Sequence, residues 1–447
     1  MRKFLIVGGG GRESAFALKL IEDTVLYAVM GHENPTITDC VRQSGGAYLI
    51  GDANAPEVVL NFAKKHEVDI VFVNADEPLA NGAVDVLLEN NIKAVGATRD
   101  AARIEWDKIY SMEMMQEICP QFTPFYRVVS RQEELQEAVQ TFINKNLQIA
   151  VKPQGLTGGK GVKVMPEHLQ TYQDATEYAA KLVKDNPAEK VLLAEKLQGI
   201  EFTIMGLTDG ENLVLAPASY DYPFRYENDL GAGTGGMGCF TAAEKTLPFM
   251  DKEDLRDCKD IMQKIIDNMR RKNLPFNGVL NGGFFKTPKG IKFMEFNGRF
   301  GDPEALNILS VLQGSFAELL ENISNKNLNE ENVRFIKKAS VVKYLVAKEY
   351  PNKSDVAVEF TVDEESIKAM GINLYFASCI RTGEGRYETL KKSRVVALGA
   401  VSETIENASD MINEAIQKYV AGNLEYRRDI GAKKSLDKLQ NTKMYRD

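Results

Sequence analysis

Short apolar runs alternate with amphipathic stretches through the first hundred residues. Lys3–Val7 is an apolar run that meets a row of glycines, and Arg12–Ile21 then has apolar residues at helical spacing. Further strand-like runs are Val25–Met30, Ile70–Val73 and Lys93–Val95, and the helical stretches between them include Pro56–Lys65 and Leu79–Leu88. Strands that alternate with helices in this way predict a parallel, Rossmann-like sheet.

The pattern changes after residue 100. An amphipathic stretch at Ala101–Glu117 carries the only Trp, Trp106. The predicted strands that follow are Val128–Ser130, Ile149–Lys152, Val191–Ala194 and Phe202–Thr208, and the predicted helices are Glu133–Asn144 and about Lys252–Arg271. Val279–Lys286 and Ile291–Asn297 predict a hairpin, because Pro288 and Gly290 stand where a type I turn favours them. From about residue 335, strands and polar turns recur and end in a helix near Glu403–Tyr419, which is typical of a smaller α+β unit.

Composition serves mainly to exclude classes of protein. A length of 447 residues suggests about three domains. Lys and Arg number 55 and Asp and Glu number 63, so the formal net charge is −8. This balance argues against a protein that overall charge holds on nucleic acid, while a local basic pocket for phosphate stays possible.

Histidine and cysteine usage narrows the chemistry further. The three His lack metal-ligand spacing, so Lys, Arg, Asp, Glu and backbone amides must supply the chemistry. The five Cys form no CxxC, which favours a reduced, cytoplasmic protein with packed thiols. The first apolar run is too short for a signal peptide, and no apolar stretch reaches the roughly 18 residues of a membrane span.

The first candidate site is the glycine row Gly8–Gly11 with Arg12 and Glu13. A strand that runs through glycines into a helix exposes backbone N–H groups to an anion. The NAD fingerprint requires Gly where Glu13 stands and an acidic residue closing the second strand, which here ends in Gly31-His32. NAD is therefore disfavoured, and two interpretations stay open: a site for another phosphate-bearing ligand, or a tight turn with no ligand.

The second candidate site is the glycine-rich segment VKPQGLTGGKGVKV, which begins at Val151. Its glycines allow the backbone to approach a polyphosphate, and Lys152 and Lys160 neutralise charge. It is no Walker A loop, because Gly161 follows the lysine where Ser or Thr is required. The alternative is a hairpin tip with solvated lysines, which two lysines and four glycines between strand-like runs make the weaker interpretation.

The third candidate site is EFNGRFGDPE, residues 295–304. On a strand, Glu295 and Asn297 project from the same face, and a carboxylate beside an amide oxygen suits Mg²⁺ with bound phosphate. Arg299 places a fork of donors near a transferring phosphoryl group. An isolated pair of this kind is usually an exposed strand face, but the adjacent Arg and the Gly-Asp-Pro turn favour the site.

Together the three clusters define a nucleoside triphosphate site that uses no His. The segments VKPQGLTGGKGVKV, LLAEKLQGIEFT, GTGGMG and EFNGRFGDPEALNIL resemble the ATP-grasp enzymes and, more narrowly, the phosphoribosylamine–glycine ligases. The resemblance runs from GGGGRE to YRRDIG, and EKLQGIEFT and VVKYLVAKEYP are most like the archaeal type. It implies an ATP-grasp fold of α/β and α+β parts: a Rossmann-like domain at 1–103, an ATP-grasp domain at 104–332 with a lid at about 124–195, and a C-terminal α+β domain at 333–447.

The resemblance also implies roles for individual residues. The implied ATP-binding residues are Lys108 and Lys152 on the phosphates, Gly158, Gly159, Lys160 and Gly161 in the lid loop, Glu195, Lys196 and Leu197 facing adenine, and Glu201 on the ribose. Backbone groups of Lys196 and Leu197 make the adenine contact. Glu295 and Asn297 hold Mg²⁺ or Mn²⁺, and Arg299, Lys152 and Asp302 are catalytic. The implied substrate-binding residues are Gly10, Gly11, Arg12, Glu13, Asp76, Asp221, Gly235 and Gly236.

The implied activity is ATP-dependent formation of glycinamide ribonucleotide from 5-phosphoribosylamine and glycine through a glycyl phosphate, in de novo purine biosynthesis. The implied partners are therefore small molecules, with no nucleic acid and no membrane, and the protein is expected to be a monomer or homodimer. The amine of phosphoribosylamine is already a nucleophile, so the reaction needs positioning and charge neutralisation more than a catalytic His or Cys.

Departures from the family pattern keep alternatives open. The family's Asp-His-Lys-Arg reads Asp221-Tyr222-Pro223-Phe224 here, its Pro-Asn before Thr234 reads Ala232-Gly233, its Gly-Pro-Glu reads Asn74-Ala75-Asp76, and the His that follows its Gly-Arg-Glu is Ser14. These changes fall at implied substrate positions. One alternative is therefore an ATP-grasp carboxylate–amine ligase for a different small acid or amine. A non-catalytic nucleotide-binding relative is a further alternative, which the intact Glu295, Asn297 and Arg299 argue against.

Overall fold

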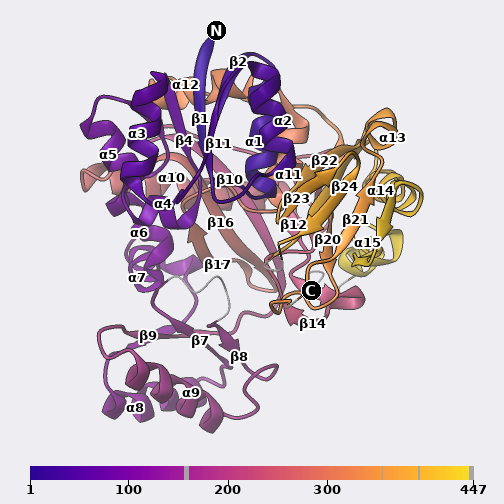
Figure 1. The fold of residues 1–447 in the computed structure, drawn as a ribbon. Helices are drawn as coiled ribbons and strands as arrows, with labels where there is room; N and C mark the ends of the chain where they lie inside the picture. The colour runs from indigo at the N-terminus through magenta and orange to yellow at the C-terminus, as the bar shows by residue number, and fades with distance from the viewer. Residues whose placement is uncertain (156–160, 355, 391–392, 442–447) are drawn as a thin grey trace.

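The N-terminal unit is a five-stranded parallel sheet in the order β3-β2-β1-β4-β5 with helices on both sides (Figure 1). Its strands are β1 (Arg2–Val7), β2 (Thr24–Met30), β3 (Tyr48–Ile50), β4 (Ile70–Val73) and β5 (Lys93–Val95). Its helices are α1 (Gly11–Leu20), α2 (Pro35–Ser44), α3 (Pro56–His66), α4 (Asp76–Ala80) and α5 (Ala83–Glu89). The apolar runs are buried on both faces, as parallel strands require, and the Rossmann-like prediction is confirmed.

The computed structural model describes residues 1–155, 161–354, 356–390 and 393–441. Gly158, Gly159 and Lys160 of the predicted lid loop therefore lie outside the described residues. Within the described part, two predicted helices are each divided in two. The predicted helix Leu79–Leu88 breaks before α5, where Gly82 adopts a φ of +83°.

The second division falls in the amphipathic stretch around Trp106. It forms α6 (Arg99–Trp106) and α7 (Lys108–Ile118), followed by the short helix η1 (Pro120–Phe122). The break is at Asp107, whose extended backbone ends α6 and whose carboxylate accepts the Tyr110 N–H at 3.1 Å. An Asp in this position caps the second helix, which the apolar spacing alone does not reveal.

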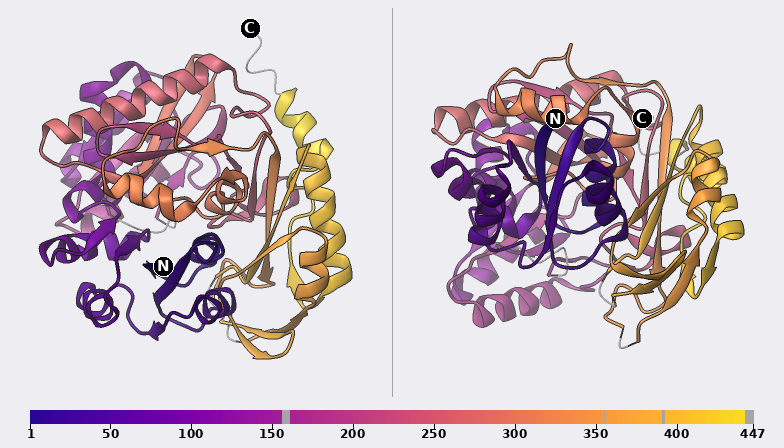
Figure 2. Two further views of the ribbon diagram at one scale, coloured as in Figure 1. Left: turned by 90° about the horizontal axis from the view of Figure 1, so that it is seen from above. Right: turned by 45° about the horizontal axis from the view of Figure 1, so that its top comes forward.

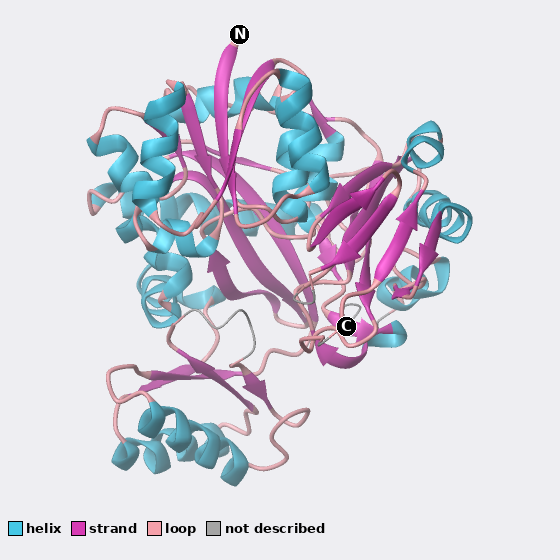
Figure 3. Ribbon diagram, viewed as in Figure 1, coloured by secondary structure: helices cyan, strands magenta, loops and turns pink. Residues whose placement is uncertain are grey.

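A small α/β unit is set apart from the rest of the molecule (Figure 1). Its antiparallel sheet has the order β6-β9-β7-β8. The elements are β6 (Tyr126–Val129), α8 (Gln132–Asn144), β7 (Ile149–Pro153), β8 (Lys163–Val164), α9 (Tyr172–Asp185) and β9 (Val191–Glu195). Figure 3 shows both helices on the face turned away from the rest of the molecule. The opposite face is left to line a cleft, to which it contributes Ala150, Lys152 and Ala194.

The central antiparallel sheet has the order β11-β10-β16-β17. Its strands are β10 (Ile200–Asp209), β11 (Leu213–Leu215), β16 (Asn277–Thr287) and β17 (Gly290–Asn297). β16 and β17 form the predicted hairpin. The helix α10 (Lys252–Arg271) has the predicted bounds, since Asp251 caps its first turn and Ile261, Ile265 and Met269 are buried. Two further helices, α11 (Glu304–Val311) and α12 (Phe316–Ser324), and the strand pair β18 (Leu312–Gln313) and β19 (Arg334–Phe335) follow.

The C-terminal sheet joins two distant parts of the chain. Its main path is β12-β15-β20-β25-β22, so strands from residues 220–241 pair with strands from residues 339–402. The strands are β12 (Tyr220–Asp221), β15 (Gly238–Thr241), β20 (Ala339–Ala347), β22 (Asn373–Phe376) and β25 (Val396–Ser402), with β27 (Leu424–Glu425) beside β20. A short pair, β13 (Phe224–Tyr226) and β14 (Leu230–Gly233), with the helix η2 (Glu227–Asp229), lies between β12 and β15.

The remaining elements complete the C-terminal unit, which lies beside the N-terminal sheet (Figure 2). A second sheet has the order β23-β24-β21-β26, made of β21 (Glu359–Val362), β23 (Cys379–Gly383), β24 (Arg386–Thr389) and β26 (Val420–Gly422). The helices are α13 (Glu364–Ala369), α14 (Ile405–Tyr419) and α15 (Lys433–Gln440). All five Cys are buried and unpaired, as predicted. Within the described ranges, no helix has the length and apolar character to cross a membrane.

Candidate active site

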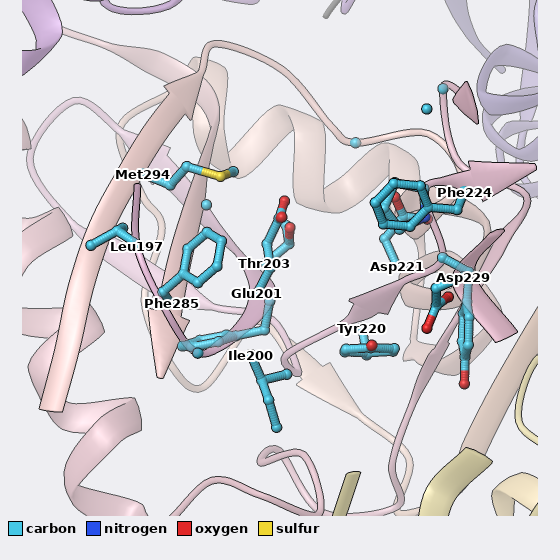
Figure 4. A pocket seen from close by; sticks show the side chains of 18 of the residues that line it. Leu197, Ile200, Glu201, Thr203, Tyr220, Asp221, Phe224, Asp229, Phe285 and Met294 are labelled. Atoms are coloured by element: carbon cyan, nitrogen blue, oxygen red, sulfur yellow. The ribbon is translucent and has the colours of Figure 1, made fainter. Parts of the chain in front are cut away.

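A cleft of about 2290 Å³ separates the small unit, the central sheet and the C-terminal sheet. This volume exceeds the usual range of about 300–1,000 Å³ for a single small ligand, so the cleft has room for several small molecules at once. Figure 4 shows Leu197, Phe285 and Met294 near one end and Asp221, Phe224 and Asp229 near the other. We call these the apolar end and the acidic end.

The apolar end contains the segment that follows β9. Glu195, Lys196 and Leu197 all line the cleft, as the adenine-facing prediction requires. The Lys196 N–H is already donated to the Gln148 carbonyl at 2.9 Å, so it is committed within the protein. An adenine contact here therefore falls to the Lys196 carbonyl or to backbone groups of Leu197.

Glu201 projects from β10 between the two ends (Figure 4). Its side chain is exposed within the cleft, whose walls surround it. This enclosure, together with the like charge of Glu295, raises the pKa of Glu201 to about 7. A carboxylate with this pKa accepts hydrogen bonds from sugar hydroxyls in either protonation state.

Two lysines lie near each other, Lys152 on the wall of the cleft and Lys108 in an adjoining cavity. Lys152 lines both the cleft and an adjoining cavity of about 160 Å³, and Lys108 lines that second cavity. Lys108 Nζ donates to the Gly155 carbonyl at 2.7 Å. Burial and the nearby charge of Lys152 lower the pKa of Lys108, against the attraction of Glu295. Gly161 of the predicted loop accepts a hydrogen bond from Tyr178 at 2.8 Å.

Glu295 and Asn297 are next-but-one neighbours on β17, and both line both cavities. Asn281 stands opposite Asn297 in the ladder and also lines the cleft. Its Oδ1 is buried and has no hydrogen-bond partner among the described residues. A set of carboxylate and amide oxygens suits a hard divalent cation, so the residues present fit Mg²⁺ or Mn²⁺. Sequence reasoning missed Asn281, because only strand pairing brings it to this place.

Arg299 is held by partners on three segments. Its Nε donates to Asp76 Oδ1 at 2.7 Å, one Nη lies 3.2 Å from Glu105 Oε1, and the same Nη donates to Asn297 Oδ1 at 3.4 Å. Burial disfavours its charge, but Glu105 and Asp76 outweigh that effect and raise the pKa of Arg299. The guanidinium is therefore a fixed cation beside the predicted metal pair.

The two carboxylates that hold Arg299 differ in character. Burial disfavours the charge of Asp76, but Arg299 and Arg12 prevail and lower the pKa of Asp76 to about 2. Burial dominates at Glu105 and raises its pKa to about 7, although the Gly298 N–H donates to it at 2.8 Å. Sequence reasoning gave Glu105 no role. The available signal was a charged residue among the buried positions of α6.

The pKa of Glu105 predicts a pH-dependent difference in stability. We expect the free energy of unfolding of the wild type, relative to Glu105→Gln, to fall as the pH rises from about 4.5 to about 7. The reason is that a carboxyl with a raised pKa binds more protons in the folded state over this range, so its contribution is complete below the unfolded pKa and lost through the folded one. Urea unfolding at several pH values measures it. A difference that does not change with pH contradicts the prediction, and Glu359→Gln, at an exposed position of β21, is the control.

The acidic end gathers carboxylates around a glycine loop. Asp221, Asp302 and Glu304 line it, and Asp221 Oδ1 has no hydrogen-bond partner among the described residues. Burial, together with Glu304 and Glu201, raises the pKa of Asp221 well above its ordinary value. Gly236, at a φ of +98°, lies so close that a Cβ there would approach Asp221 Oδ1 to 2.7 Å. Such a site favours a positively charged group.

The N-terminal glycine row is partly satisfied by the protein itself. The Gly8 N–H is donated to Val29 at 2.9 Å, and the Gly10 N–H to Glu13 Oε2 at 2.8 Å. Arg12 is the residue of this row that lines the cleft. Although burial disfavours its charge, the Glu13 carboxylate holds the pKa of Arg12 above its ordinary value. The structure therefore brings Arg12 to the cleft and places Gly10, Gly11 and Glu13 behind it.

Gly11 has a strict steric requirement, which predicts a mutational effect. A Cβ at Gly11 would lie 2.0 Å from the hydroxyl oxygen of Tyr344, which is fully buried. We expect Gly11→Ala to lower the free energy of unfolding by about 1–3 kcal/mol or more, because the ring has to move. Denaturant unfolding measures the effect. Gly31→Ala is the matched control, since no heavy atom lies within 4 Å of its Cβ. Equal stabilities for the two variants would contradict the prediction.

The Rossmann-like sheet, the small α/β unit over the central sheet, and a cleft with a lysine, the predicted metal pair and a fixed arginine together define an ATP-dependent ligase of the ATP-grasp class. Family models agree along most of the chain. The Phosphoribosylglycinamide synthetase N domain matches residues 2–105, the ATP-grasp (A) domain matches residues 106–305, and the C domain matches residues 340–433. The chain belongs to the phosphoribosylglycinamide synthetase family.

Individual relatives agree with the family models. The chain is 38% identical over 438 residues to a phosphoribosylamine–glycine ligase of Methanothermobacter thermautotrophicus, covering 98% of each chain. It is also 38% identical over 440 residues to that of Methanocaldococcus jannaschii, again covering 98% of each. The solved phosphoribosylamine–glycine ligase of Thermotoga maritima has a TM-score of 0.79 at 23% identity, covering 96% of this chain and 100% of that one. The last likeness concerns the fold alone.

Proposed function

We propose that this protein joins glycine to 5-phosphoribosylamine at the expense of ATP and releases glycinamide ribonucleotide, ADP and phosphate, as a step of purine biosynthesis. The observation that carries the proposal is the position of Arg299. It contacts Asn297 of the metal pair on one side and Asp76 of the predicted substrate residues on the other. A cation that stabilises a transferring phosphoryl group belongs between the phosphate donor and its acceptor.

The apolar end and its lysines form the ATP site in this proposal. Adenine lies against Leu197 and Met294, Glu201 accepts from the ribose hydroxyls, and Lys108 and Lys152 neutralise phosphates. Glu295 and Asn297 hold Mg²⁺ or Mn²⁺, which when bound neutralises and orients the phosphate oxygens. The apolar wall, the enclosed carboxylate and the paired lysines support these assignments.

The acidic end forms the glycine site. Asp221, whose Oδ1 has no hydrogen-bond partner among the described residues, and its neighbour Glu304 favour an ammonium group, which directs the glycine carboxylate toward Arg299. A carboxylate oxygen of glycine then bonds to the γ-phosphorus as the bond to the ADP oxygen breaks, which gives glycyl phosphate. Next, the amine of phosphoribosylamine bonds to the carbonyl carbon, the bond from that carbon to the phosphate oxygen breaks, and the amine proton passes to the departing phosphate or to water.

Arg12 is the proposed contact for the phosphate of phosphoribosylamine. It lines the cleft, its charge is held by Glu13, and it lies beside Arg299 and Asp76. Gly10, Gly11 and Glu13 support it from behind.

We further propose that the protein works in the cytoplasm as a monomer or homodimer. The buried free thiols support the part of this proposal that concerns a reducing compartment.

The test is ADP release by the purified protein in a coupled spectrophotometric assay. We expect release to depend on both glycine and phosphoribosylamine and to yield glycinamide ribonucleotide by mass spectrometry. ATP turnover that is indifferent to both substrates would contradict the proposal.

The second candidate function is that of an ATP-grasp carboxylate–amine ligase for a different small acid or amine, and the acidic end supports it. Tyr222, Pro223 and Phe224 line the cleft where the family has His, Lys and Arg. A panel of small acids and amines separates the two functions. If only glycine together with 5-phosphoribosylamine supports turnover, a different acid or amine substrate is excluded.

A further inference from the structure

Arg394 reaches the cleft from the C-terminal unit, in the segment just before β25. One Nη donates to the carbonyls of Gly235 at 2.5 Å, Gly236 at 3.0 Å and Asp302 at 2.9 Å. The other Nη lies 3.0 Å from Asp302 Oδ2. The side chain is only 11% exposed and lines the cleft. One guanidinium therefore fastens a glycine loop and a turn that lie 66 residues apart in sequence.

Tyr344 on β20 supports this guanidinium. The Arg394 guanidinium carbon lies 4.4 Å from the Tyr344 ring centroid, and the Tyr344 hydroxyl donates to Asp302 Oδ1 at 2.8 Å. Asp302 is thus held by one oxygen on the tyrosine and by the other on the arginine. Because Tyr344 is fully buried and lies against Gly11, this arrangement is anchored in the core rather than on the surface.

The Gly235–Gly236 loop, whose carbonyls accept from Arg394, lies next to the proposed binding site for the substrate glycine. Gly236 lies against Asp221, and the loop amides are occupied: Gly235 donates to the Tyr350 hydroxyl, and Gly236 donates to Thr234 Oγ1, both at 3.1 Å. The backbone of Arg394 is itself fixed, since its carbonyl accepts the Ser378 N–H at 3.0 Å. The C-terminal unit therefore sets the shape of the acidic end through a side chain that reaches into it.

From this geometry we infer that Arg394 is a positioning residue for the ligase reaction: it holds the Gly235–Gly236 loop and Asp302 so that the acidic end fits its substrate. The inference rests on the proposed function for the identity of that substrate. Only a planar guanidinium presents donors in enough directions to bind three carbonyls and a carboxylate at once, so a lysine replaces it incompletely.

One test is independent of the substrates. We expect hydrogen exchange in the free, full-length Arg394→Ala protein to be about tenfold faster or more at the amides of residues 235–237, with little change in α10. Arg381→Ala is the matched control, because Arg381 belongs to the same unit and forms an ion pair with Asp39 but does not line the cleft. Unchanged exchange in the loop of Arg394→Ala would overturn the inference.

The second test uses kinetics. We expect Arg394→Ala to reduce kcat/KM for glycine about 100-fold, a typical result of misplacing a substrate by about 1 Å, while the Kd for ATP stays within about twofold. We expect the kcat/KM of Arg394→Lys for glycine to lie between those of Arg394→Ala and the wild type. If Arg394→Ala does not fold, Arg394→Lys takes its place in the test. Equal losses of ATP binding and turnover would overturn the positioning role. Absence of wild-type turnover with glycine and phosphoribosylamine refutes the proposed function instead, and the exchange test then decides the inference alone.

Discussion

Arg299→Ala is expected to reduce kcat about 1,000-fold while changing the Kd for ATP less than about tenfold. The side chain is a fixed cation between the proposed metal pair and the acidic end, held by Asp76 and Glu105. Phosphoryl transfer depends on such preorganised charge, and removing one arginine of this kind costs about 10³-fold or more in rate. The effect should therefore appear in the transition state and scarcely in the bound ground state. Steady-state kinetics and direct ATP binding measure the two quantities.

Two comparisons control this experiment. Arg299→Lys keeps the charge but cannot contact Asp76, Glu105 and Asn297 together, so we expect it to recover only a small part of the rate. Thermal unfolding of each variant separates loss of charge from loss of structure, because Arg299→Ala leaves Glu105 buried without its cation. An Arg299→Ala protein that is stably folded and loses ATP binding as much as rate would contradict the proposed role.

Local sequence pattern predicted the phosphate-binding lysine Lys152 and the pair Glu295 and Asn297. Lys152, Glu295 and Asn297 stand at strand positions whose alternation directs them to one face, and each lines the cleft. The lysine and the predicted metal pair belong to different sheets, and each was predicted from a segment of a few residues, whereas Asn281 opposite Asn297 was not. Patterns of this kind are readable because the backbone geometry of a strand alone determines which side chains share a face.

The residues that sequence reasoning missed are those whose partners are distant. Glu105 contacts Arg299, which lies 194 residues later in the sequence, and Arg394 contacts Gly235, which lies 159 residues earlier. A buried charge in a helix or loop indicates that a partner exists, but its spacing carries no information about which one. The first contact follows from the packing of α6 against β17, and the second from the C-terminal sheet, in which β15 pairs with β20. No local motif encodes either arrangement.

The glycine row shows a different reason for incomplete prediction. Four successive glycines indicate exposed backbone amides, yet Glu13 folds back onto the Gly10 N–H and occupies one of them. The usual capping box begins with Ser or Thr, so a glycine in the first position hides the motif. The prediction that this row meets the cleft therefore rests on Arg12, whose side chain reaches it.

Glu295→Gln is expected to reduce kcat about 100-fold or more and to raise the Mg²⁺ concentration needed for half-maximal rate. The substitution keeps the shape of the side chain and removes the one carboxylate of the proposed metal pair, and hard divalent cations bind carboxylate oxygens more strongly than amide oxygens. Metal titrations of the rate measure the shift. Mn²⁺ binding followed by electron paramagnetic resonance in the presence of a non-hydrolysable ATP analogue measures it without turnover.

The control for this prediction is Glu359→Gln, a strand carboxylate outside the cleft, which should behave like the wild type. Asn297→Asp gives the opposite change at the neighbouring position. The added carboxylate should tighten Mn²⁺ binding, but it also places a negative charge 3.4 Å from the arginine nitrogen that must stabilise the phosphoryl group, and it therefore lowers kcat. Glu295→Gln with wild-type metal dependence would mean that the charge of Glu295 serves Lys108 rather than a metal, since Glu295 is also the main attraction that opposes the lowering of the pKa of Lys108. The two variants together thus decide whether Glu295 binds the metal ion or instead stabilises the charge of Lys108.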